Sequence, residues 1–153
     1  MNMNRILTAK SAALVLTAAI SGAVLGFYFG PRVAQAASAP QVVAFDRVIN
    51  GKLDVFSPGV SYKLITTQNG ADFAATQITS IKRHAHFHST EFLYVVSGTG
   101  MVTLGTKRRV IGPGDMISIP MGTPHAFKAN GPPLRFVEVD VPSIAANDIH
   151  WLP

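Results

Sequence analysis

The stretch HAHFHSTE, residues 84–91, decides the fold together with a further histidine, His125. In an extended strand, residues two apart point to the same face, so His84 and His86 can enter one cavity. Glu91 and His125 would then reach that cavity from neighbouring strands. Three imidazoles and one carboxylate in this spacing form a donor set that is typical of a metal site.

The sequence from Val60 onward has the pattern of an all-β barrel or sandwich. Short runs of β-branched and aromatic residues alternate with turns rich in Gly, Pro and Asn. Strands are expected at residues 60–67, 73–82, 91–97, 101–104, 108–111, 116–119, 125–128 and 134–141. Turns are expected at residues 68–71, 97–100, 112–115 and 130–133, with no helix between these strands.

The spacing of these residues closely resembles the two motifs of the cupin superfamily. The first motif reads His84-x-His86, Glu91 and Gly98, and the second reads Gly114, Pro120-x-Gly122 and His125. The resemblance implies a small jelly-roll barrel with His84, His86, Glu91 and His125 as metal ligands. The sequence departs from the family pattern at Ile78, where a Gly is usual, and at Ala129, where an Asn is usual. Neither position is a ligand in the family, so the ligand set is unaffected.

Residues 1–36 resemble an export signal. Residues 11–30 contain no charged side chain and follow a segment that carries Arg5 and Lys10. Ala34-Gln35-Ala36 supplies the small-x-small pattern that signal peptidase prefers. Alternatively, residues 11–30 remain as an uncleaved anchor, since about 20 apolar residues can span a bilayer. In both cases the barrel is expected outside the cytoplasmic membrane, either periplasmic or secreted, or anchored there.

The chain after the signal is expected to form one domain, because its length suits a single hydrophobic core. The expected boundaries are an N-terminal extension at 37–59, a barrel at 60–142 and a C-terminal tail at 143–153. Val42, Val43 and Phe45 suggest an edge strand in the extension. The tail carries the only Trp, Trp151, which is expected to pack on the barrel, with substrate stacking as the alternative.

The charge of the chain indicates no nucleic-acid partner. The formal charge of +5 falls to +2 without residues 1–36, which contain three basic residues and no acidic one. The adjacent Arg108 and Arg109 make only a small basic patch. The absence of Cys excludes disulfides and thiol catalysis.

The donor set predicts one divalent transition-metal ion per chain. Imidazole and carboxylate ligands suit Fe, Mn, Ni, Cu or Zn, and the sequence does not distinguish among them. A shifted ligand set in which His88 replaces His84 is the alternative, but it leaves only two residues before Glu91. A buried Glu91 needs a cationic partner, and Lys82 or Arg83 is the alternative to a metal.

The pocket around the ion can be outlined from strand alternation. Phe127 shares a face with His125, so an apolar wall is expected beside the metal. Leu93 and Val95 share a face with Glu91 and are expected to line the same pocket. Lys82 shares parity with His84 and is the candidate partner for an anionic substrate group, unless its charge extends to the barrel mouth.

These features predict an exported metal-binding cupin, and the resemblance implies a metal-dependent oxygenase or isomerase that acts on a small chelating substrate. The alternative is a non-catalytic periplasmic module that binds or senses a metal or small ligand, because no second carboxylate for proton transfer is evident in the sequence. A metal-free structural barrel is a third possibility, although it leaves Glu91 unpaired. Open barrel edges and the cupin resemblance both indicate a homodimer.

Overall fold

The computed structural model of the chain describes residues 40–153. Within this range the chain forms one short helix and eleven strands. In chain order they are α1 (Phe45–Ile49), β1 (Asp54–Ser57), β2 (Val60–Gln68), β3 (Ala71–Ile78), β4 (Ser80–Ala85), β5 (Thr90–Ser97), β6 (Gly100–Leu104), β7 (Lys107–Ile111), β8 (Met116–Ile119), β9 (His125–Ala129), β10 (Leu134–Val141) and β11 (His150–Trp151). The predicted signal or anchor segment lies outside the described residues. Among the described residues, no helix has the length and apolar character needed to cross a membrane.

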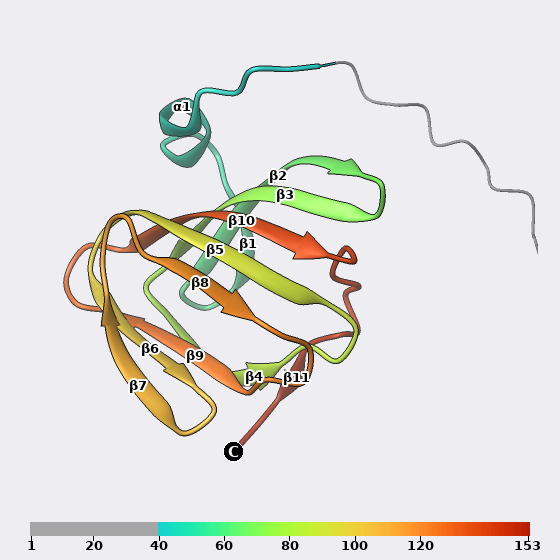
Figure 1. Cartoon of the computed structure of the whole chain (residues 1–153). Helices are drawn as coiled ribbons and strands as arrows, with labels where there is room; N and C mark the ends of the chain where they lie inside the picture. The colour runs from blue at the N-terminus through green and yellow to red at the C-terminus, as the bar shows by residue number, and fades with distance from the viewer. Residues whose placement is uncertain (1–39) are drawn as a thin grey trace, which may run out of the picture. The chain divides into compact units, whose positions relative to one another are not determined.

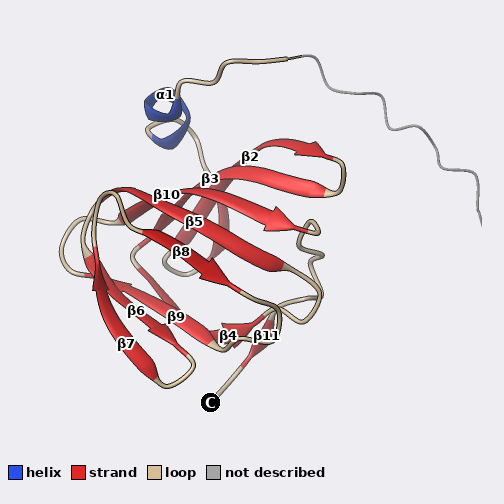
Figure 2. Ribbon diagram, in the orientation of Figure 1, coloured by secondary structure: helices blue, strands red, loops and turns tan. Residues whose placement is uncertain are grey.

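The strands form two antiparallel sheets that face each other around a shared interior (Figures 1 and 2). The six-stranded sheet has the order β1-β2-β3-β10-β5-β8, and the five-stranded sheet has the order β11-β4-β9-β6-β7. The core between them consists of Val60, Ile78, Leu93, Val95, Val102, Ile111, Ile117, Ile119, Phe127, Leu134 and Phe136. The all-β prediction is therefore confirmed for the described residues, and the arrangement is consistent with a jelly-roll.

The expected strands are confirmed at their predicted positions except for residues 73–82, which the sequence predicts as one strand. The structure divides this segment at Thr79 into β3 and β4, which belong to different sheets. The Thr79 N–H donates to the Gly59 carbonyl at 2.8 Å, and the Thr79 carbonyl accepts from the Ala129 N–H at 2.9 Å. Thr79 is thus the corner where the chain passes from one sheet to the other.

The N-terminal extension differs from the prediction. The prediction of an edge strand around Val42, Val43 and Phe45 is wrong, because Val42 and Val43 lie in no strand and Phe45 begins helix α1. The partly or fully buried residues Phe45, Val48 and Ile49 have helical spacing, which explains why this segment coils. The edge strand of this region is β1, which comes later and pairs antiparallel with β2.

Candidate metal centre

The four predicted ligands are buried and line one cavity. His84, His86, Glu91 and His125 are 3%, 5%, 7% and 1% exposed. His84 lies in β4, Glu91 lies near the start of β5, and His125 is the first residue of β9. The pairing of β4 with β9 places His84 directly opposite His125. The fold therefore brings together donors from both sheets.

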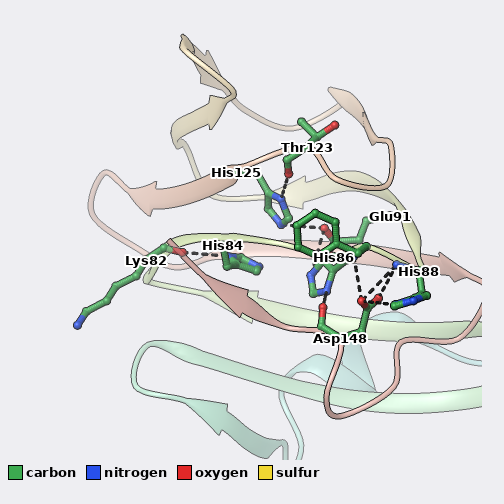
Figure 3. A network of polar contacts seen from close by, with 9 residues as sticks. Lys82, His84, His86, His88, Glu91, Thr123, His125 and Asp148 are labelled. Atoms are coloured by element: carbon green, nitrogen blue, oxygen red, sulfur yellow. Dashed lines mark hydrogen bonds and ion pairs between the residues drawn. The ribbon is translucent and has the colours of Figure 1, made fainter. Parts of the chain in front are cut away.

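A β-bulge in β4 orients the first of these histidines. Ile81 lies opposite Phe127 and His84 opposite His125, so the register shifts between Ile81 and His84. An extra residue in one strand reverses the side-chain alternation beyond it. Ile81 and His84 therefore both line the cavity, whereas the Lys82 side chain is exposed and points away from the histidines (Figure 3). Of the two expectations for Lys82, the structure therefore disagrees with a place inside the pocket and agrees with an exposed charge.

Main-chain carbonyl groups fix the orientation of all three buried imidazoles (Figure 3). The Nδ1 atoms of His84, His86 and His125 lie 2.8, 2.9 and 2.9 Å from the carbonyl oxygens of Lys82, Asp148 and Thr123, respectively. A carbonyl oxygen can only accept, so each Nδ1 carries the proton and donates it. In the neutral form of the ring, each Nε2 is then left with a free lone pair. Metal-ligating histidines are oriented in this way.

The free nitrogens converge with the Glu91 carboxylate. Donor atoms of His84, His86 and His125 lie within 4.8 Å of one another. Glu91 Oε2 lies 2.8 Å from His125 Nε2 and 3.7 Å from His86 Nε2. Glu91 Oε2 and His125 Nε2 are both buried without a hydrogen bond of acceptable geometry. Two facing acceptors at this distance repel unless a cation or a proton lies between them, so the donor set is compatible with a metal ion and, without one, with a proton on His125.

The titration behaviour of the ligands is consistent with strong coupling between them. Burial, and then the neighbouring His125, lowers the pKa of His84 to about 4, so its imidazole is neutral at pH 7. Burial opposes ionisation of Glu91, yet its contact with His125 lowers the pKa of the carboxyl group. Burial likewise acts against the charge on His125, but Glu91 raises the pKa of this imidazole. Glu91 is therefore a carboxylate, the form that binds metal.

The positions of the side chains support neither alternative for these residues. His88, the alternative ligand, has a side chain that is 83% exposed and lies 2.9 Å from Asp148 Oδ1 instead of lining the cavity. Within residues 40–153, Glu91 forms ion pairs with His86 and His125 only, so neither Lys82 nor Arg83 neutralises it.

The cavity has a volume of about 420 Å³, which suits a small molecule. Leu93 and Phe127 line it as predicted, and the Phe127 ring stands edge-on to His125 with the ring centroids 6.2 Å apart. Val95 also faces inward but is fully buried in the core and does not reach the cavity. Trp151 does not line the cavity either, and its ring packs against His84 with a centroid separation of 5.4 Å.

Three further carboxyl groups line the cavity, and the sequence reasoning missed them. Asp140 on β10 lies opposite Asp72 on β3 and opposite Glu91 on β5, so three acidic side chains form a row across adjacent strands. Glu138, two residues before Asp140 on β10, also lines the cavity and completes the group. The alternation of Leu134, Phe136, Glu138 and Asp140 along β10 is the signal that could have revealed them.

Burial and mutual repulsion change the ionisation of this acidic group. Burial, and then the Glu91 carboxylate, raises the pKa of Glu138 to about 7. Burial, and then Glu138 and Glu91, raises the pKa of Asp140 to about 9. Like charges opposite each other on neighbouring strands are destabilising, so protons or a bound cation must offset part of this charge.

The C-terminal tail supports the candidate metal centre through Asp148, which is 2% exposed. Its carboxylate accepts from the main-chain N–H of Phe87 at 2.9 Å and from that of His88 at 3.0 Å. Its carbonyl accepts from His86, as described above. Although burial opposes the charge, the bonds from His88 and Phe87 lower the pKa of Asp148 to about 2. Its partners lie some sixty residues earlier, so no local sequence pattern predicts this contact.

Residues 75–140 match the family described as "Cupin domain". These residues form a cupin domain. The match includes all four predicted ligands, and it confirms the resemblance on which the sequence analysis depends.

Comparisons with individual proteins agree with the family match. The chain is 33% identical over 70 residues to the uncharacterized protein MJ1618 of Methanocaldococcus jannaschii, covering 45% of this chain and 56% of that protein. The cupin fold also resembles Streptomyces Pac13, a nucleoside dehydratase, with a TM-score of 0.55 and 18% identity over 61% of this chain and 78% of that one. Ectoine synthase from P. lautus gives a TM-score of 0.58 and 17% identity over 74% and 91% of the two chains. At these identities the structural matches show the fold alone.

Proposed function

We propose that this protein is a metal-dependent enzyme that moves protons on a small chelating substrate, as an isomerase does. The observation that carries the proposal is the row of carboxyl groups beside three imidazoles that share one cavity. The sequence suggested either an oxygenase or an isomerase, and the acidic groups favour the second. A catalyst of this kind needs positioned groups that take and return protons, which the carboxyl groups can supply.

The ion would be held by His84, His86, Glu91 and His125, with Fe, Mn, Ni, Cu or Zn all suited to these donors. When bound, it supplies a Lewis acid that polarises a substrate oxygen. Main-chain carbonyls hold the imidazoles in place, so little reorganisation is needed when substrate arrives. Phe127 and Leu93 restrict water on the apolar side of the cavity.

Glu138 and Asp140 are the groups placed to exchange protons with the substrate. Both line the cavity, and their carboxyl oxygens lie within 4.8 Å of one another and of Glu91. An ionised carboxyl group can take a proton from one substrate atom while a protonated one gives a proton to another, so the reaction leaves the total proton count unchanged. Ectoine synthase and a nucleoside dehydratase share this fold, which supports the proposal that it can accommodate such chemistry.

The metal site is tested first by elemental analysis of purified protein. We expect about one divalent ion per chain, and loss of that ion in His84→Ala and His125→Ala variants. Full occupancy in both variants would contradict the assigned ligands. Identification of the ion in protein from the native host would also show whether oxygen chemistry is open to it.

Catalysis is tested by turnover with a panel of small hydroxy, keto and amino compounds, using Mn-, Fe- and Zn-loaded protein. Proton exchange at substrate carbon, followed by NMR in deuterated water, is the expected activity. Oxygen consumption without such exchange would favour the oxygenase. Thermal stabilisation by a ligand without any turnover would favour the binding or sensing module.

We also propose export and self-association, which rest on sequence features. The mature N-terminus, determined by mass spectrometry on periplasmic protein, is expected directly after Ala36. An intact chain in the membrane fraction would indicate an anchor at residues 11–30 instead. Gel filtration with light scattering tests the expected homodimer.

A further inference from the structure

The charge of the cavity limits the substrates that it can accept. Four carboxyl groups line it, and among the described residues no Lys or Arg does. The only basic side chain that the sequence suggested for the pocket, Lys82, is exposed. A divalent ion bound by the histidines and Glu91 would offset two charges when all four carboxyl groups are ionised, and an anionic group entering beside the other ionised carboxyl groups would be repelled.

The members of the acidic row differ in how far their hydrogen-bonding capacity is used. Asp72 Oδ1 accepts from Thr67 Oγ1 at 2.6 Å and from Ser143 Oγ at 2.9 Å, so this carboxylate is occupied by the protein itself. Asp140 is 5% exposed, lines the cavity, and its Oδ1 has no hydrogen-bond partner. A buried polar atom without a partner is unusual in a native protein, and a ligand donor would satisfy it.

We propose that the substrate presents a protonated amine to Asp140 and Glu138 while one of its oxygens reaches the metal centre. This inference rests on the proposed function and names the substrate class of the same site. Glu91 lies within 4.8 Å of both carboxyl groups and 2.8 Å from His125 Nε2, so amine and oxygen are separated by a short spacer. The apolar side chains of Leu64, Ile81 and Ile144 line the same cavity and would contact the carbon atoms of that spacer.

Three probes of similar size separate charge from shape. Ethanolamine, ethylene glycol and glycolate are two-carbon compounds with a hydroxyl group at one end. The other end is a cationic ammonium group in ethanolamine, a neutral hydroxyl group in ethylene glycol and an anionic carboxylate in glycolate. Binding to Zn-loaded full-length protein is measured by isothermal titration calorimetry. We expect ethanolamine to bind most tightly, although glycolate is the better metal chelator in solution. Equal binding of ethanolamine and ethylene glycol, or tighter binding of glycolate, would overturn the inference.

Isosteric neutral variants locate the effect. Asp140→Asn and Glu138→Gln should each weaken ethanolamine binding roughly ten- to a hundredfold and leave ethylene glycol unaffected. Asp46→Asn, which neutralises an exposed carboxylate on α1, is the matched control and should change nothing. Thermal unfolding checks that every variant is folded.

Metal content separates failure of this inference from failure of the proposed function. Zn content should stay near one per chain in Asp140→Asn and Glu138→Gln, because neither is assigned as a ligand. Two ions per chain in the wild type, and one in Asp140→Asn, would show that the acidic row binds a second cation. That result would overturn the inference that a substrate amine binds there. One ion without a preference for ethanolamine would reject the amine and leave the metal centre intact.

Discussion

Replacing Asp148 by alanine should destabilise the protein and weaken the metal centre together. Asp148 lies in the C-terminal tail, and its carboxylate binds the main-chain N–H groups of Phe87 and His88. These two residues directly follow His86, whose Nδ1 donates to the Asp148 carbonyl at 2.9 Å. One tail residue therefore orients a ligand and holds the loop behind it.

The magnitude follows from the bonds that are lost. Each hydrogen bond to a charged acceptor contributes about 1.5–3 kcal/mol, so two main-chain bonds correspond to roughly 3–6 kcal/mol. For a domain of this size that loss lowers Tm by roughly 10–25 °C. The His86 bond uses the main chain of Asp148 and survives the substitution only while the tail stays in place. Loss of such support typically weakens metal affinity about 10- to 100-fold.

Differential scanning calorimetry on metal-free protein measures the first effect, and Zn titration against a chelating dye measures the second. His88→Ala is the matched control, because it removes only the contact between an exposed imidazole and Asp148. The His88 imidazole is exposed although Asp148 is buried, and the two main-chain bonds to Asp148 remain, so this variant should lose less stability than Asp148→Ala and retain its metal. Asp148→Asn keeps one acceptor oxygen and should fall between the two. An unchanged Tm and Zn affinity in Asp148→Ala would refute the reasoning.

The same contact predicts an acid limb in the stability profile. The pKa of Asp148 is lowered to about 2 in the folded protein from an ordinary value of 3.8. A lowered carboxyl pKa stabilises the folded state above the unfolded-state pKa, and this stabilisation is lost as pH falls toward about 2. The free energy of unfolding of the Asp148→Asn variant should therefore depend less on pH between about pH 4 and pH 2 than that of the wild type, as measured by urea unfolding at a series of pH values.

Three further outcomes are expected. In metal-free protein, Asp140→Asn should raise Tm, because the pKa of Asp140 rises from 3.8 to about 9 on folding, so that ionisation of this group opposes folding. The increase in Tm should grow with pH between these two values, and an unchanged Tm at pH 8 would contradict this. Lys82→Ala should leave metal content and probe binding unchanged in calorimetry, because its side chain is exposed. Gly59→Ala should lower stability in urea unfolding by about 1–3 kcal/mol, because Gly59 has φ +87° and an added Cβ would lie 2.5 Å from the Ser80 carbonyl oxygen; wild-type stability would show that this corner can relax.

Strand positions could be read from the sequence because they depend on local patterns. β-branched runs and the turn residues between them predict β2 and β5 to β10 within one or two residues. At the hairpin between β2 and β3, Asn69 and Gly70 have φ of 52° and 75°, the conformation that an Asn-Gly turn favours. The corner at Thr79 has no such signal, because the runs on its two sides are continuous.

The candidate metal ligands could also be predicted from the sequence, whereas their surroundings could be predicted only in part. The spacing of His84, His86, Glu91 and His125 is local to two motifs, and the structure brings these four side chains together. The pocket position considered for Lys82 assumed that side chains alternate regularly along β4. A β-bulge between Ile81 and His84 interrupts this alternation, and the sequence gives no sign of it. Asp148 was missed because its partners are distant in sequence. Glu138 and Asp140, by contrast, follow the alternation of β10 and required only that it be continued.

The inward acidic residues of β10 show why a departure from a folding rule can be informative. Leu134 and Phe136 are fully buried apolar residues, and the next two inward positions would normally continue the core. Glu138 and Asp140 occupy them instead and oppose folding through burial and repulsion. A position that could be made more stable by a neutral residue is retained where binding or catalysis needs the charge. If the proposed function is correct, the end of β10 that faces the histidines is the part of the barrel where stability and function are in conflict.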